Sequence, residues 1–141
     1  MKKVAVVFWS GTGNTKAMAD AVAEGAKNAG AEVSVMGPGE FGKDKVAEFD
    51  AIAFGCPAMG DEVLEEEEFE PMFAGVEKSL AGKEIALFGS YGWGDGQWMR
   101  DWEKRCNAAG VKPAAESVMA NNEPDEAALG NCKALGASLA K

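Results

Sequence analysis

The chain has 141 residues, which suits one domain, and its 23 acidic and 14 basic side chains give a net charge of −9 without any histidine. This negative charge disfavours binding to nucleic acid or to an anionic membrane surface, and the lack of histidine excludes imidazole catalysis and histidine-ligated zinc. We therefore expect a single domain over residues 1–141 whose chemistry comes from carboxylates, thiols, the backbone or a bound cofactor.

The cysteine pattern argues against a disulfide framework and against a metal site. Cys56, Cys106 and Cys132 are odd in number and lack the CxxC spacing of iron–sulfur and zinc sites. We expect three inert packing thiols, as is usual in a reducing cytoplasm. The N-terminal apolar run breaks at residues 10–13 without a cleavage context for a signal peptide, and no stretch reaches transmembrane length.

Apolar runs alternate with helical spacings along the chain. Five runs have the character of buried strands: residues 4–9, 32–36, 51–55, 85–89 and 112–120. The last is the weakest, because Pro113 and nearby alanines dilute it. Four segments have the apolar spacing of a helix with one buried face: residues 18–29, 71–80, 98–109 and a segment from about Pro124. This alternation predicts a three-layer α/β fold, with a five-stranded parallel sheet between helices on both faces.

Glycines concentrate where three of these strands end. Eight of the 18 lie at the ends of the first, third and fourth strands or just beyond them: Gly11, Gly13, Gly55, Gly60, Gly89, Gly92, Gly94 and Gly96. In an open sheet of order 2-1-3-4-5, ligands bind at the carboxyl edge between strands one and three. Glycine lets the backbone approach a ligand closely, so three such loops predict a ligand held largely by main-chain groups.

The first of these loops, Ser-Gly-Thr-Gly-Asn-Thr at residues 10–15, stands between a strand and a helix N-terminus. Backbone N–H groups, small hydroxyls and the helix dipole make such a turn suitable for a phosphate dianion without an arginine. The loop lacks the Walker spacing, and Lys16 stands where a dinucleotide motif has its third glycine. The alternative is a capped tight turn without a ligand.

The other two loops carry large side chains outside any helical stripe. Met59, Tyr91 and Trp93 lie in glycine-rich segments, where a flat aromatic ligand between a thioether and an indole accounts for them. The alternative is that Tyr91 and Trp93 only cover the edge of the sheet. Cys56 does not predict a phosphatase, because Glu62 stands where that chemistry needs an arginine.

Three motifs together carry a family resemblance: WSGTGNT at residues 9–15, GCPAMGDE at 55–62 and FGSYGWGDG at 88–96. Over essentially its whole length the chain resembles the short-chain flavodoxins of clostridia and related anaerobes. The resemblance implies a flavodoxin-like fold and noncovalently bound FMN, which carries single electrons at low potential between larger redox enzymes. The residues that it assigns to FMN are Ser10, Gly11, Thr12, Gly13, Asn14, Thr15, Pro57, Ala58, Met59, Gly60, Asp61, Glu62, Ser90, Tyr91, Gly92, Trp93, Gly94, Asp95 and Asn122.

The resemblance also implies a role for several of these residues. The loop at 10–15 would hold the phosphate, with Lys16 adding attraction, while Met59 and Trp93 would lie against the two faces of the flavin. The Gly60 peptide would turn on reduction so that its carbonyl accepts from flavin N5–H, a change that glycine makes cheap. Glu62 would accept from flavin N3–H, and Asn122 would lie near the ring.

Most of the net charge lies in one segment beside the proposed flavin. Residues 61–70 carry seven carboxylates and no basic residue: Asp61, Glu62, Glu65, Glu66, Glu67, Glu68 and Glu70. Besides being a solvated acidic run, this segment is expected to lower the flavin potential and to guide docking to basic patches on redox partners.

We thus expect a monomeric cytoplasmic electron carrier that is not an enzyme and binds neither nucleic acid nor membrane. The alternative within the same fold is an FMN-dependent NAD(P)H:quinone reductase, and an alternative without flavin is a phosphate-binding regulatory module.

Overall fold

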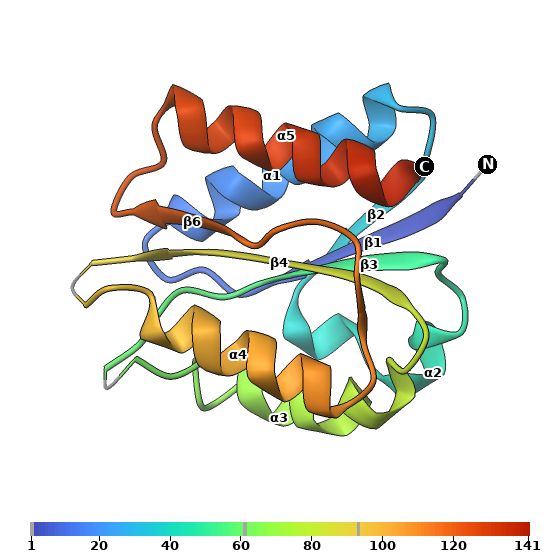
Figure 1. Ribbon diagram of the computed structural model, residues 1–141, viewed down its shortest axis with the longest axis horizontal. Coiled ribbons are helices and arrows are strands. Elements are labelled where there is room, and N and C mark those ends of the chain that lie inside the picture. Colours follow the sequence, from blue (N-terminus) through green and yellow to red (C-terminus); the bar gives the residue numbers. More distant parts are fainter. Residues whose placement is uncertain (1, 61, 93) are drawn as a thin grey trace.

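The computed structural model describes residues 2–60, 62–92 and 94–141 (Figure 1). Its helices and strands are, in order, β1 (Lys3–Phe8), α1 (Asn14–Asn28), β2 (Glu32–Met36), α2 (Lys43–Val46), β3 (Ala51–Gly55), α3 (Phe69–Val76), β4 (Glu84–Tyr91), α4 (Gln97–Ala108), β5 (Lys112–Pro113), β6 (Val118–Asn121) and α5 (Glu126–Ala140). Short 3-10 turns occupy Pro38–Glu40 and Glu77–Ser79. Among the described residues, no helix has the length and apolar character needed to cross a membrane.

All the strand pairs are parallel, and the sheet order is β2-β1-β3-β4-β5, with β6 also paired to β4. This confirms the predicted parallel sheet of order 2-1-3-4-5. β3 lies in the middle and all five of its residues are buried, as its uninterrupted apolar sequence predicts. The strand order reverses next to β1, so a crevice forms where the carboxyl ends of β1 and β3 meet.

The predicted fifth strand, residues 112–120, is wrong as a continuous element. β5 pairs with the start of β4 (Ile85 opposite Pro113) and β6 with its end (Phe88 opposite Val118). Two residues of β4 thus stand opposite the four residues 114–117, which bulge out of the sheet. Pro113 has no N–H to continue the ladder, and the surplus residues break the register.

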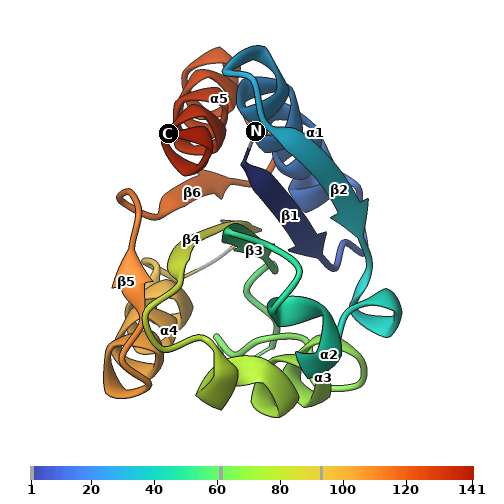
Figure 2. The same ribbon diagram turned by 90° about the vertical axis from the view of Figure 1, so that its right-hand side faces the viewer.

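Helices cover both faces of the sheet (Figure 2): α1 and α5 pack on one, and α2, α3 and α4 on the other. Each face carries its own hydrophobic cluster: the first lies under α1 and α5, and the second under α2, α3 and α4. Alternate residues of β1 point to opposite faces, so Val4 and Val6 belong to the first cluster and Val7 to the second. Trp98 and Trp102, both 2% exposed, lie in the second cluster. Their four-residue spacing along α4 therefore marks core packing, as predicted.

Two glycines allow α1 and α5 to pack very closely. A Cβ atom at Gly25 would collide with the carbonyl oxygen of Lys133, and one at Gly136 would collide with that of Val22. Each helix thus presents bare backbone to the other, and larger side chains at these two positions would force the helices apart.

The helix predicted at residues 71–80 begins earlier and ends sooner, because α3 starts at Phe69 and gives way to a 3-10 turn after Val76. The earlier start coincides with Glu65, which is only 6% exposed. Its carboxylate accepts hydrogen bonds from the N–H groups of Glu67 at 2.9 Å and of Glu68 and Phe69 at 2.8 Å. Glu65 thus satisfies the N–H groups that open the helix.

Candidate functional site

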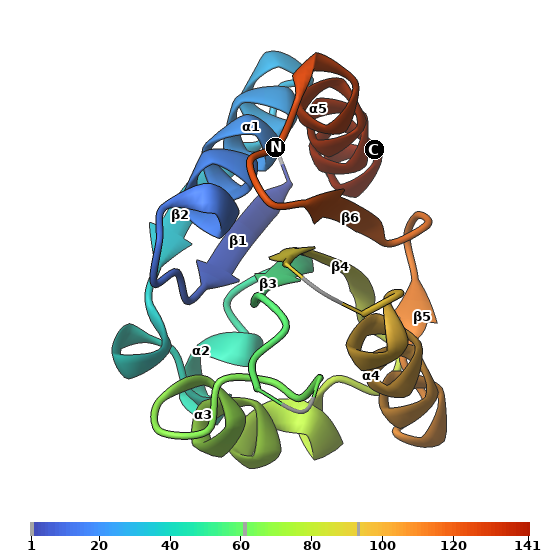
Figure 3. The same cartoon turned by 90° about the vertical axis from the view of Figure 1, so that its left-hand side faces the viewer.

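The carboxyl ends of β1, β3 and β4 gather at the edge that faces the viewer in Figure 3. A cavity of about 230 Å³ opens there. Its lining residues come from all three glycine-rich loops and from the end of β6: Trp9, Ser10, Gly11, Thr12, Asn14, Thr15, Pro57, Ala58, Met59, Ser90, Tyr91, Gly92 and Asn122. The structure thus brings together the three segments that the sequence places around one crevice.

The first loop turns the chain from β1 into α1. The Ser10 hydroxyl oxygen accepts hydrogen bonds from the N–H groups of Gly13 and Lys16, at 3.1 and 3.2 Å. Gly13 has φ 98°, in the left-handed region that favours glycine. Asn14 and Thr15 begin the 15-residue helix α1 and line the cavity. The positive end of the helix dipole and several hydroxyls thus border the same space, which suits an anion.

The second loop is closed at its base by an isolated antiparallel bridge between Met59 and Val63. The Met59 N–H donates to the Val63 carbonyl oxygen at 2.9 Å, and the Val63 N–H donates to the Met59 carbonyl oxygen at 3.1 Å. Gly60, inside the turn, has φ 39°. The bridge thus holds the two ends of the turn that contains Gly60, with Met59 at the cavity.

Glu62 is held in an uncommon backbone conformation, with φ 58°. Its Oε1 atom is buried and has no hydrogen-bond partner among the described residues. A Cβ atom at Gly94, which has φ 89°, would collide with this oxygen. The carboxylate is therefore packed against bare backbone and has an acceptor that a ligand N–H group could satisfy.

The third loop continues from β4. The Ser90 carbonyl oxygen accepts from the N–H of Ala58 at 3.0 Å, and the Tyr91 carbonyl oxygen accepts from the N–H of Asn122 at 2.7 Å. The Tyr91 ring lies 5.5 Å from the Trp98 ring, centre to centre. Tyr91 therefore both lines the cavity and covers the core, so the two sequence-based interpretations of this residue are compatible.

Some predicted site residues do not line the cavity. Among the described ones, these are Gly13, Gly60, Glu62, Gly94 and Asp95; Asp61 and Trp93 fall outside the described residues. Glu62 lines a separate cavity together with Trp98 and Arg105. Asp95 is 80% exposed in its side chain and pairs with Arg100 at 2.9 Å. Lys16 does not line the cavity either, because its ammonium pairs with the Asp20 carboxylate at 3.1 Å.

Trp9 is the lining residue that the sequence-based assignment misses. Its indole Nε1 donates to Oε2 of Glu68 at 2.7 Å, and its ring lies next to Gly11, where a Cβ atom would come within 3.0 Å of it. Its position directly before the first loop is the sequence signal that indicates a lining residue. The hydrogen bond to Glu68 has no such signal, because Glu68 lies 59 residues away in the sequence. Trp9 thereby connects the first loop to the acidic segment.

A larger cavity, of about 440 Å³, lies beside the interruption between β5 and β6. Glu103 and Glu116 are among its lining residues, and the Glu103 carboxylate accepts from the Ser117 hydroxyl at 2.7 Å. Two carboxylates repel a phosphate dianion, and the lining residues that the structure describes include no helix N-terminus that would provide the opposite charge. The smaller cavity is therefore the better phosphate site despite its size.

The acidic segment is less uniformly solvated than its sequence indicates. Glu65 is internal: burial by itself would raise its pKa, but the N–H donors of Phe69, Glu68 and Glu67 outweigh burial and hold the pKa below its ordinary value. Glu68 binds the Trp9 indole. Glu66, Glu67 and Glu68 are exposed, and since Glu68 is engaged by Trp9, Glu66 and Glu67 are the most accessible to a partner among the described carboxylates of this run.

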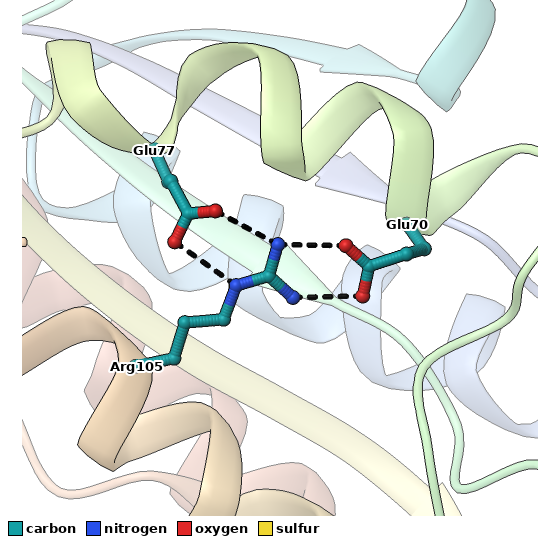
Figure 4. A network of polar contacts seen from close by, with 3 residues as sticks. All are labelled: Glu70, Glu77 and Arg105. Carbon is teal, nitrogen blue, oxygen red and sulfur yellow. Dashed lines mark hydrogen bonds and ion pairs between the residues drawn. The ribbon is translucent and has the colours of Figure 1, made fainter.

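Arg105 neutralises another part of the segment (Figure 4). Its guanidinium donates to both carboxylate oxygens of Glu70, at 2.7 Å each, and to both of Glu77, at 2.9 Å each. It also lies 4.9 Å from the centre of the Phe73 ring. The hydrogen bonds to Glu70 and Glu77 raise the pKa of Arg105 above its already high ordinary value. This network connects α4 to α3. It also places a positive charge beside Glu70, although the acidic segment itself contains no basic residue.

Cys56, Cys106 and Cys132 are all buried. Burial raises the pKa of each thiol to about 12. The reactive thiolate is thus scarce at neutral pH, which agrees with the predicted packing role.

The cavity fits a flat, phosphorylated heterocycle. The α1 N-terminus and the hydroxyls of the first loop suit the phosphate, and the side chains of Trp9 and Met59 provide apolar surface. Glu62, which follows Met59 in the second loop without lining the cavity, has a buried acceptor with no partner among the described residues. These are the groups needed for the FMN that the resemblance implies.

Comparison with known proteins identifies the family. The family profile for flavodoxin matches residues 6–135. A flavodoxin of Clostridium beijerinckii is 45% identical over 135 residues, which cover 96% of this chain and 97% of that protein. One of Megasphaera elsdenii is 44% identical over 138 residues, or 98% of each chain. The solution structure of the two-electron reduced Megasphaera elsdenii flavodoxin superimposes with a TM-score of 0.90, 44% identity and coverage of 97% of this chain and 98% of that one. The chain therefore belongs to the flavodoxin family, whose members are electron carriers that bind FMN.

Proposed function

We propose that the cavity between the three loops is the FMN site of this electron carrier, within one domain formed by residues 1–141. The observation that carries the proposal is that all three loops line one cavity at the N-terminus of α1. The proposed contacts are Ser10, Gly11, Thr12, Gly13, Asn14 and Thr15 for the phosphate, and Pro57, Ala58, Met59, Gly60, Asp61, Glu62, Ser90, Tyr91, Gly92, Trp93, Gly94, Asp95 and Asn122 around the flavin.

The first loop binds the phosphate through neutral groups. The Ser10 oxygen is already engaged by two N–H groups, so its own proton is available to the ligand. The N–H groups of the first turn of α1 have no partner within the helix. A dianion can thus be held on a chain of net charge −9 without an arginine in the loop.

The second and third loops hold the ring. FMN supplies one-electron chemistry when it is bound. Met59 lies against the cavity because of its bridge to Val63, and Trp93 is proposed to stack on the opposite side. Glu62 accepts from a ring N–H with its buried oxygen, and Gly60 gives the backbone freedom to adapt when the charge of the ring changes.

The exposed carboxylates give the carrier its docking surface. We propose that Glu66 and Glu67, both exposed, face basic patches on larger redox enzymes and speed the encounter at low salt. The chain acts as a monomer. Its compartment is a reducing cytoplasm, which is where buried cysteines without disulfides, such as its three, are usual. It turns over no substrate of its own.

The experiment is an anaerobic reductive titration of the purified chain with FMN bound. The proposal predicts two separate one-electron steps and no reduction by NADPH alone. Rapid bleaching of the flavin by NADPH without another protein would instead identify a reductase and overturn the carrier assignment. A chain that does not bind FMN would overturn the site as well.

A further inference from the structure

Two hydroxyl groups meet in the interior beside the proposed FMN site. Thr15, in the first turn of α1, is 1% exposed, and Ser90, near the end of β4, is 4% exposed. Their Oγ atoms are 3.1 Å apart, and the Ser90 N–H also donates to Thr15 Oγ1 at 3.4 Å. Both residues line the cavity. Buried hydroxyls need defined partners, so the direction of each hydrogen bond matters here.

Ser90 is the residue through which all three loops are connected. Its carbonyl oxygen accepts from the N–H of Ala58 in the second loop at 3.0 Å. Its N–H and its hydroxyl contact Thr15 in the first loop, and Ser90 itself opens the third loop. The contact with the second loop uses only backbone. Removing the hydroxyl therefore changes the link to Thr15 and leaves the other connections in place.

The Thr15 and Ser90 hydroxyls have two protons, and the hydrogen bond between them needs only one. A threonine hydroxyl has one proton and two lone pairs. The Ser90 N–H occupies one lone pair of Thr15 Oγ1, and a donating Ser90 hydroxyl occupies the other. The Thr15 proton is then left over, and no hydrogen bond within the described parts of the chain uses it. It is available to an acceptor in the cavity.

We propose that Ser90 is a positioning residue for phosphate recognition: by donating its N–H and its hydroxyl proton to Thr15 Oγ1, it directs the Thr15 proton toward a phosphate oxygen. The inference rests on the proposed placement of the FMN phosphate at residues 10–15. A phosphate dianion only accepts hydrogen bonds, so a hydroxyl whose lone pairs are already occupied recognises it better than one that is free to rotate. Ser90 needs no contact with the phosphate itself.

The test compares FMN with riboflavin, which has the same ring system and no phosphate. The full chain, freed of flavin, is titrated with each compound, and binding is followed by quenching of flavin fluorescence. Ser90→Ala is expected to weaken FMN binding about fivefold, the value of one hydrogen bond, and to leave riboflavin binding unchanged. The matched control is Ser117→Ala, which removes a serine hydroxyl bonded to Glu103 outside the site and is expected to change neither affinity.

A double-mutant cycle shows whether Ser90 acts through Thr15. Thr15→Val is expected to weaken FMN binding about thirtyfold, as for a hydrogen bond to a charged group, and Ser90→Ala should add nothing in the Thr15→Val background. The ³¹P resonance of bound FMN should also shift in the Ser90→Ala protein. If that variant does not fold, Ser90→Cys, with a weak donor of similar shape, should give the same preferential loss of FMN.

The outcomes separate this inference from the proposed site. Equal losses for FMN and riboflavin in Ser90→Ala would mean a merely structural role, and an unchanged FMN affinity would mean no role; either result overturns the inference. A full Ser90→Ala effect in the Thr15→Val background would also overturn it. If Thr15→Val leaves the ratio of FMN to riboflavin affinity unchanged, the placement of the phosphate itself fails.

Discussion

Glu65 is predicted to stabilise the fold much more than its exposed acidic neighbours. Its Oε1 accepts from the N–H groups of Glu68 and Phe69, and its Oε2 accepts from that of Glu67. In Glu65→Gln, the amide oxygen can keep the first two bonds, while the NH₂ group faces the third N–H and cannot accept from it. The loss of one charge-assisted bond and of the negative charge at the α3 N-terminus is expected to cost about 2 kcal/mol.

Thermal unfolding at a fixed FMN concentration measures this cost when both proteins bind FMN with the same Kd, which a parallel titration checks, because bound ligand then raises the apparent stability equally in both. A cost of this size lowers the melting temperature of a domain this long by about 6 °C. Glu66→Gln, which makes the same change of charge at an exposed neighbour, is the matched control. It is expected to stay within about 0.5 kcal/mol of the parent protein.

The effect of Glu65 should also depend on pH in a defined direction. Because the pKa of the folded carboxyl lies below its ordinary value of 4.5, its contribution is fully present above that pH and is lost as pH falls through the lower, folded value. The parent protein and Glu65→Gln should therefore converge in stability at acid pH, once the pH has fallen below the lowered pKa of the folded carboxyl. Equal melting temperatures for Glu65→Gln and Glu66→Gln at pH 7, or a difference that does not change with pH, would refute the capping role.

Three other perturbations test separate parts of the account. Gly136→Ala should lower the free energy of unfolding by about 2 kcal/mol or more in chemical denaturation, since its Cβ meets the Val22 carbonyl oxygen; a neutral result would contradict the close packing of α1 and α5. Arg105→Gln should destabilise by about 2 kcal/mol because the partly buried Glu70 and Glu77 lose their partner, and replacing both glutamates by Gln as well should restore part of the loss. The double variant Glu66→Gln and Glu67→Gln should raise the potential of the second one-electron step by on the order of 30 mV per carboxylate, for charges about 10 Å away at an effective dielectric near 40. It should also slow electron transfer to basic partners at low salt, and an unchanged potential and rate would count against the role of the acidic segment.

The strands and the location of the cavity could be predicted from local patterns, whereas the order of the sheet followed from the general α/β fold and the family resemblance. The apolar run of β3 identifies a central strand, and the glycines after β1, β3 and β4 lie at the edge where the cavity opens. Both signals work because burial and turn geometry are decided largely by neighbouring residues.

The features that the sequence analysis did not predict depend on contacts between distant segments. Nothing local distinguishes Glu65 from Glu66, Glu67 and Glu68, because the buried position of Glu65 follows from the way the chain returns from β3 to α3. In the same way, Trp9 gains its partner Glu68 only through the fold. The interruption between β5 and β6 depends on register against β4, which a weak apolar pattern around Pro113 does not specify.

A crystal structure of the protein with FMN bound tests the central claim most directly. The account predicts that the phosphate lies within hydrogen-bonding distance of the N–H groups and hydroxyls of residues 10–15, with the ring between the second and third loops. FMN in the larger cavity beside residues 114–117, or a phosphate turned away from the N-terminus of α1, would contradict it.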